Sequence, residues 1–185
     1  MDPLKNISLD VNRIILQLLI RGIFAFYPYI LLFANRFNNL SISDGYLGAI
    51  IFILSVSAGL VIEDFASQIE SECWDKQNDS KFPERENEWN KYLKFKTLES
   101  EMPIAQKYLR TILIRMKFEL SFAIALLIMI IGLCILEYYI NFCQSCMQFW
   151  LVCIILPFSI ACYQLYESKQ SSILLIKIRK NIISD

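Results

Sequence analysis

The sequence of 185 residues contains no histidine. That absence removes the usual proton shuttle, the usual zinc ligand and every histidine-activated nucleophile, and with them most enzyme classes. The Gly-rich phosphate loop and the GxSxG and HExxH motifs are also missing. Ser43-Asp44-Gly45 resembles part of a lipid-phosphotransferase signature, but the acidic repeats which that signature requires are absent. We therefore expect no enzymatic activity, no metal and no cofactor.

The chain also lacks net charge, because 18 basic residues balance 18 acidic ones. Binding of nucleic acid through bulk charge is therefore not indicated. The length would suit one soluble domain. However, 56% hydrophobic residues and a mean hydropathy of +0.43 are too apolar for a solvated surface around one core. The composition indicates a protein whose solvent is partly the lipid bilayer.

Long apolar stretches are abundant, and they predict an all-α, polytopic membrane protein. The clearest of these stretches is FELSFAIALLIMIIGLCILEYYI, in which no charged residue occurs between Phe122 and Leu136. About 18 or more apolar residues are what a helix needs to cross the roughly 30 Å hydrocarbon core. Charged and aromatic residues flank this stretch, as they flank helices anchored at both interfaces. We predict four spans in one membrane domain, at about 14–33, 46–62, 118–140 and 149–166.

Between spans two and three lies a polar segment, 63–117, which we expect to be a largely helical extension. One long helix is expected from about Met102 to Ile140, because apolar residues recur every four positions up to the third span. The tail, 167–185, is basic with one apolar side, so it could lie on the membrane surface or pack against a partner chain. Lys and Arg concentrate in the two termini and in 63–117. The positive-inside rule then places these parts in the cytoplasm.

Polar residues inside the predicted spans are candidates for a pore. Gln17 and Arg21 are four residues apart and share one helix face, and Pro28 is expected to kink the same helix. Arg21 either extends its stem to the near interface or is buried, where it lines a pore or pairs with an acid. In the second span Ser55 and Gly59 have the small-xxx-small spacing of a packing face, and Ser57 is a further pore candidate.

Charges at the inner ends of spans two and three suggest an ion-pair cluster. Glu63 and Asp64 follow the second span, whereas Arg110, Arg115 and Lys117 precede the third. We expect these acids and bases to meet just inside the membrane. The cluster either neutralises interfacial charge or acts as a gate that moves both spans when 63–117 rearranges.

Two further features lie in the polar parts of the chain. Trp74, Trp89 and Tyr92 form an aromatic face on which a cytoplasmic regulatory protein could dock. Cys143 and Cys146 form a CxxC between the third and fourth spans, with neither a βαβ context nor a second ligand pair. They are packing residues, or a local disulfide if the loop faces an oxidising compartment.

Several segments carry a resemblance to a known group of proteins. GLVIEDFASQIES with the following WD, then EWNKYL, and then QKYLRTILIRMKFELS cover about the middle third of the chain. In pattern and layout they resemble small four-span membrane proteins of bacterial antiphage defence systems, of the Hailong or Kiwa type. This resemblance implies an oligomeric effector, a tetramer, that permeabilises the inner membrane or is held shut until a cytoplasmic signal arrives.

Two functions from different classes follow. The first is a gated pore or membrane-disrupting effector, which must be a symmetric homo-oligomer because four helices cannot enclose a water-filled pore. The alternative is a non-conducting anchor that recruits a cytoplasmic partner. A pore predicts that Gln17, Arg21, Ser55 or Ser57 faces a symmetry axis, whereas an anchor predicts that they pair within one subunit.

Overall fold

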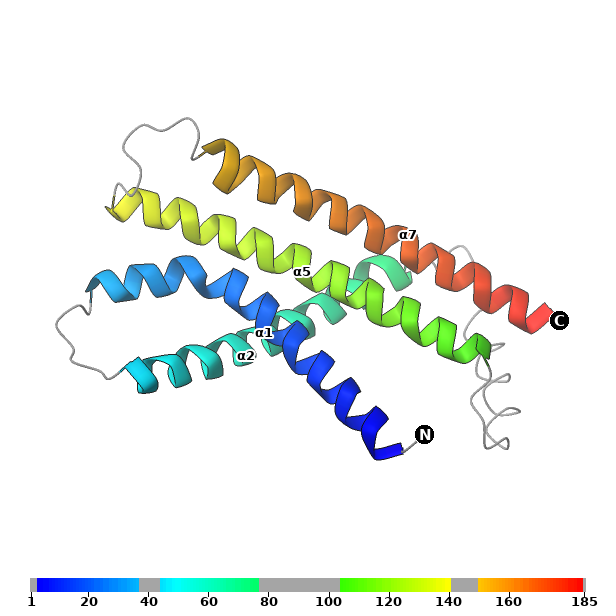
Figure 1. Cartoon of the computed structure of the whole chain (residues 1–185). Helices are drawn as coiled ribbons and strands as arrows, with labels where there is room; N and C mark the ends of the chain where they lie inside the picture. Colours follow the sequence, from blue (N-terminus) through cyan, green and yellow to red (C-terminus); the bar gives the residue numbers. More distant parts are fainter. Residues whose placement is uncertain (1–2, 37–43, 77–103, 141–149, 185) are drawn as a thin grey trace. The chain divides into compact units, whose positions relative to one another are not determined.

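A computed structural model describes residues 3–36, 44–76, 104–140 and 150–184, and all of these are helical. This confirms the all-α prediction for the described part of the chain. The elements follow one another as shown in Figure 1. They are α1 (Pro3–Arg36), α2 (Asp44–Ile69), the π-helix η1 (Glu70–Asp75), α5 (Ile104–Ile140), the π-helix η2 (Trp150–Ile155) and α7 (Leu156–Ser184).

Three of the described helices are long and apolar enough to cross a membrane. Their apolar parts are Ile14–Phe33, Gly45–Trp74 and Tyr108–Tyr139, which cover nearly all of the first three predicted spans. The fourth predicted span, 149–166, is divided between the π-helix η2 and the first turns of α7, apart from residue 149, which lies outside the described residues. Because α7 continues into a polar second half, its span is not evident from length and composition, and we treat it below as part of a proposal.

Two expected extensions beyond the spans are present. α5 runs without interruption from Ile104 to Ile140, as expected for the long helix before and within the third span. α2 continues past Ile62 to Ile69 and then into η1, as its apolar periodicity predicts. Most of the expected extension between these two helices, residues 77–103, lies outside the described residues.

The chain forms two compact units. Unit 1 consists of Met1–Phe65 and Ser121–Tyr163, and unit 2 consists of Ala66–Leu120 and Gln164–Asp185.

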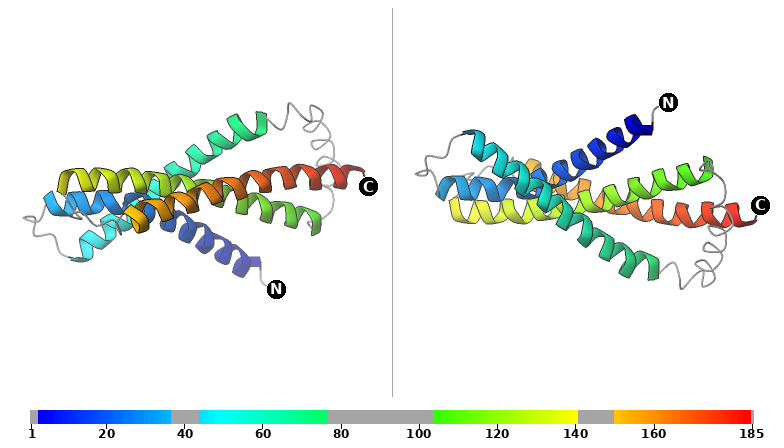
Figure 2. Two further views of the ribbon diagram at one scale, coloured as in Figure 1. Left: turned by 90° about the horizontal axis from the view of Figure 1, so that it is seen from above. Right: turned by 90° about the horizontal axis from the view of Figure 1, so that it is seen from below.

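In unit 1, glycines bring the helices into close contact. A Cβ added at Gly22 of α1 would overlap the backbone of Ser55 in α2, and one at Gly59 would overlap the backbone of Leu18. The two helices therefore cross with their backbones touching. The small residues Ser55 and Gly59 permit this close approach, as the predicted packing face requires. α1 bends part-way along its length, and its second half runs beside the second half of α5 (Figures 1 and 2). There, Gly132 of α5 accommodates the ring of Pro28, which lies inside α1.

In unit 2, the first half of α5 packs against the second half of α7. Its hydrophobic cluster contains Leu109, Ile112 and Met116 of α5 and Leu175 of α7. The hydroxyl of Ser168 donates to the carbonyl of Met116 at 2.8 Å.

The apolar side of the predicted tail packs in part against α5 of the same chain. Residues 167–184 continue α7, and Leu175 and Ile176 on their apolar side are buried within the chain. Leu175 packs there against Leu109, Ile112 and Met116 of α5.

Candidate functional site

Arg21 forms a buried polar cluster with groups from three helices of unit 1. It lies on α1 and only 4% of its side chain is exposed. Its Nε donates to the carbonyl of Gln17 at 2.9 Å, and its Nη1 donates to Ser121 Oγ of α5 at 2.8 Å. The same Nη1 lies 3.4 Å from Glu63 Oε2 of α2. One guanidinium therefore joins α1, α2 and α5.

Of the arrangements left open for Arg21, the structure has the buried one in which the base pairs with an acid. The side chain is enclosed by α1, α2 and α5. An unpaired charge in such surroundings would be strongly unfavourable, so a carboxylate and hydroxyl partners are what the position requires. Glu63 is 39% exposed, so this pair is enclosed on the arginine side only.

The partner of Glu63 differs from the predicted one. The sequence suggested a base on the approach to the third span, but Glu63 pairs with Arg21. The crossing of α1 and α2 explains the difference. Gly22, adjacent to Arg21, touches the backbone of α2, which brings the guanidinium within reach of a carboxylate two turns further along α2.

The remaining pore candidates have different environments. Gln17 is half-buried and contributes its backbone carbonyl to Arg21. Ser55 is fully buried at the helix crossing, and its Oγ has no hydrogen-bond partner among the residues that the structure describes. Ser57 is exposed and lines a shallow groove of about 320 Å³, whose other lining residues, such as Phe26 and Ile128, are apolar. Within one chain, Arg21 is thus paired with an acid and Ser55 is packed between two helices.

A second polar cluster lies in unit 2. The Nε of Arg115 on α5 is 2.6 Å from Glu119 Oε1 one turn later, and its Nη2 is 3.3 Å from Glu167 Oε2 of α7. Glu119 is buried and also accepts a hydrogen bond from Ser171 Oγ of α7 at 3.3 Å. This cluster joins α5 to α7, as the Arg21 cluster joins three helices in unit 1.

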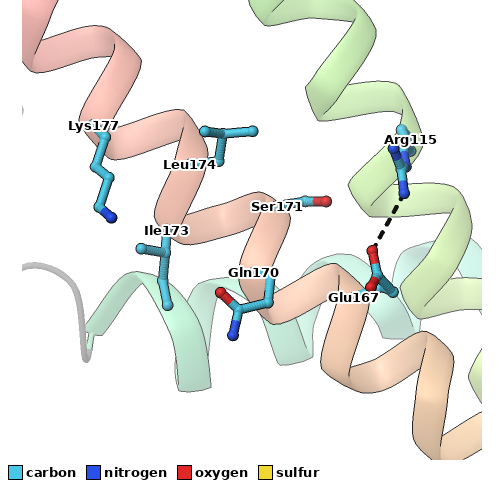
Figure 3. A pocket seen from close by; sticks show the side chains of 7 residues that line it. All are labelled: Arg115, Glu167, Gln170, Ser171, Ile173, Leu174 and Lys177. Carbon is cyan, nitrogen blue, oxygen red and sulfur yellow. Dashed lines mark hydrogen bonds and ion pairs between the residues drawn. The ribbon is translucent and has the colours of Figure 1, made fainter.

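Beside the second cluster is an open pocket of about 290 Å³ (Figure 3). Arg115 projects towards it from α5, and its other lining residues come from α7. They are Glu167, Gln170, Ser171, Ile173, Leu174 and Lys177. Two cationic side chains, one carboxylate, and hydrogen-bonding and apolar groups thus line one opening, which suits an amphipathic ligand better than a purely polar one.

The other predicted site residues are spread over the chain. Asp64 and Arg110 are exposed, and Lys117 is half-buried. Trp74, a predicted docking residue, is partly buried against the hydrophobic cluster of unit 2, and so it is less available to a partner than predicted. The rest, Trp89, Tyr92, Cys143 and Cys146, lie outside the described residues.

Glu63 is a site candidate predicted from the sequence, whereas the other acids and the hydroxyls of the two clusters are not; these are Glu119, Glu167, Ser121 and Ser171. Glu119 and Arg115 have the i,i+4 spacing of a helical ion pair, so this signal was present. Glu167 and Ser171 also have one-turn spacing, on the face of α7 that meets α5. Nothing in the sequence near Ser121 indicates that it would face Arg21, 100 residues away.

The described residues contain no group of three or more metal-ligating side chains. The two clusters hold helices together through ion pairs and hydrogen bonds, and each contains a buried charged residue type, Arg21 in the first and Glu119 in the second. Comparison with known proteins finds no family model, no curated protein and no solved structure that matches this chain.

Proposed function

We propose that this chain is the subunit of a gated pore or membrane-disrupting effector in a bacterial inner membrane, of the kind found in Hailong- or Kiwa-type antiphage defence. Four spans, with α7 supplying the fourth, and a cytoplasmic location of both termini and of 63–117 belong to this proposal. The observation that carries it is the Arg21 cluster. A charge enclosed in an apolar bundle is costly, and such charges mark ion pathways and switching elements in membrane proteins.

The cluster would act as a latch. Arg21 holds α1, α2 and α5 through a single guanidinium, and Glu63 lies where α2 leaves its predicted span. A movement of the segment after Glu63 would pull its carboxylate from Arg21 and release α2 from α1. Interfaces of this kind have discrete arrangements, so a local displacement can become a change of state.

The subunit would have to form a symmetric oligomer to enclose water. Only 17% of the apolar stretch of α2 is buried inside the chain, compared with 50% of that of α5. α2 therefore exposes a large apolar surface, which lipid or neighbouring subunits would cover. A tetramer is the assembly that the resemblance implies.

The second candidate is a non-conducting membrane anchor for a cytoplasmic partner. A specific observation favours it, since Arg21 is paired with Glu63 within one chain and Ser55 is packed at a helix crossing. In this case the cluster would only stabilise the bundle.

The two candidates differ in conductance and in oligomeric state. Purified protein would be sized in detergent and then incorporated into planar bilayers, as the natural chain, as Glu63→Leu and as Asp64→Asn. Asp64 is the matched control, because it is the adjacent acid and is exposed. The latch predicts a defined oligomer whose conductance rises with Glu63→Leu and not with Asp64→Asn. A monomer that is silent in all three forms would favour the anchor and overturn the pore.

A further inference from the structure

We infer that the pocket beside Arg115 is a binding site for a phosphate-bearing amphiphile, and that its natural occupant is the headgroup of an anionic phospholipid. This inference rests on the proposed membrane placement. It concerns only unit 2, and it assigns a ligand class to a pocket distinct from the Arg21 latch.

Two basic side chains of the pocket favour an anionic ligand. Arg115 and Lys177 reach the pocket from α5 and α7. The Arg115 side chain is 63% exposed, although Glu119 and Glu167 neutralise much of its charge. Lys177 makes no ion pair with any residue that the structure describes, so its ammonium is the cation that remains for an anionic ligand.

The charged residues of α7 are predominantly basic. α7 carries four basic residues, of which three lie at 177–180, and a single acid, Glu167. Clusters of Lys and Arg next to the cytoplasmic end of a membrane helix attract anionic lipid, with about 1 kcal/mol for each residue near the surface.

The rest of the lining suits a lipid better than an inorganic ion. Gln170 and Ser171 offer hydrogen-bonding groups, whereas Ile173 and Leu174 add apolar side chains to the lining, and Leu174 is 43% exposed. A phosphodiester could contact the first pair and Lys177 while the start of an acyl chain lies on the second.

The pocket residues Arg115 and Glu167 lie next to the ends of two predicted spans. Arg115 comes three residues before the predicted third span begins at Phe118. Glu167 comes directly after the predicted fourth span ends at Tyr166. Under the proposed topology both ends lie on the cytoplasmic side, where headgroups are found, so the pocket would open at the depth of the lipid phosphates.

The test measures lipid retention by the full chain. Protein purified in detergent would be titrated with phosphatidylglycerol or with phosphatidylcholine, and bound lipid counted by native mass spectrometry. Lys177→Gln removes the unpaired cation. Lys169→Gln is the matched control, because Lys169 is an exposed lysine on the same helix outside the pocket. Glycerol 1-phosphate, added as competitor, distinguishes a lipid headgroup from a soluble phosphorylated molecule.

We expect preferential retention of phosphatidylglycerol, reduced about fivefold by Lys177→Gln and unchanged by Lys169→Gln. Weak displacement by glycerol 1-phosphate would assign the site to lipid, whereas full displacement would assign it to a soluble phosphate ligand. Equal retention of both lipids, or equal losses in the two variants, would overturn the site.

Failure here would be separable from failure of the proposed function. A chain that conducts but shows no lipid preference refutes the pocket alone. A chain that retains phosphatidylglycerol through Lys177 but never conducts refutes the pore alone.

Discussion

The unequal burial of Arg21 and Glu63 predicts that removing the acid costs more stability than removing the base. Their atoms lie 3.4 Å apart, and an effective dielectric constant of about 20 gives an attraction of about 5 kcal/mol. The carboxylate is 39% exposed, so water screens part of this attraction. Glu63→Leu removes the carboxylate and leaves the guanidinium of Arg21, which is only 4% exposed, without Glu63 as its partner. We expect the free energy of unfolding to fall by about 3 kcal/mol, at the low end for breaking a buried pair.

Arg21→Met leaves a carboxylate that water can reach, so the remaining cost is mainly the hydrogen bond to Ser121, about 1–2 kcal/mol. The double variant should cost less than the sum of the two single ones, since neither charge is then left alone. The assay is unfolding in mixed micelles of increasing SDS content, followed by circular dichroism. A loss for Arg21→Met equal to or larger than that for Glu63→Leu would refute this account of the cluster.

Three further predictions use the same unfolding assay. Gly59→Ala should lower the SDS midpoint, because its Cβ would overlap the backbone of α1, whereas Gly48→Ala, which meets nothing, should leave it unchanged; equal effects would contradict the crossing. Met116→Ala should lower the free energy of unfolding by about 2–5 kcal/mol, because Met116 is only 2% exposed. Ile114 is 37% exposed, so Ile114→Ala should lower it by less than half as much. The reverse order would contradict the packing of unit 2. Ser168→Ala should cost about 1 kcal/mol through its lost hydrogen bond, and a neutral result would show that this bond adds nothing.

Much of the helical framework follows from the sequence. Long apolar runs predict the first three helices that are apolar enough to cross a membrane, and the four-residue recurrence before the third run predicts that α5 extends beyond it. The fourth apolar run is less decisive, because the π-helix η2 interrupts it and a polar half-helix follows. The sequence therefore predicts a helix well where apolar residues recur with the helical period over its whole length.

The partners of the charged residues could not be predicted in the same way. The sequence marks Arg21 as unusual, because this residue lies inside an apolar run. Its partners Glu63 and Ser121 depend on how closely α1 approaches α2, which two glycines determine, and on the rotation of α5. The apolar side of the tail was recognised too, yet its burial against α5 depends on contacts more than 50 residues apart, such as Ser168 with Met116. Such pairings are properties of packing and have no local signature.

The measurement that tests the membrane arrangement most directly is the side on which each terminus lies. Epitope tags at both ends would be probed with antibody in right-side-out and in inverted inner-membrane vesicles. Four spans predict that both tags are reached only in inverted vesicles. Three spans, with α7 outside the membrane, would put the tags on opposite sides, and that result would contradict the topology on which the latch and the lipid pocket depend.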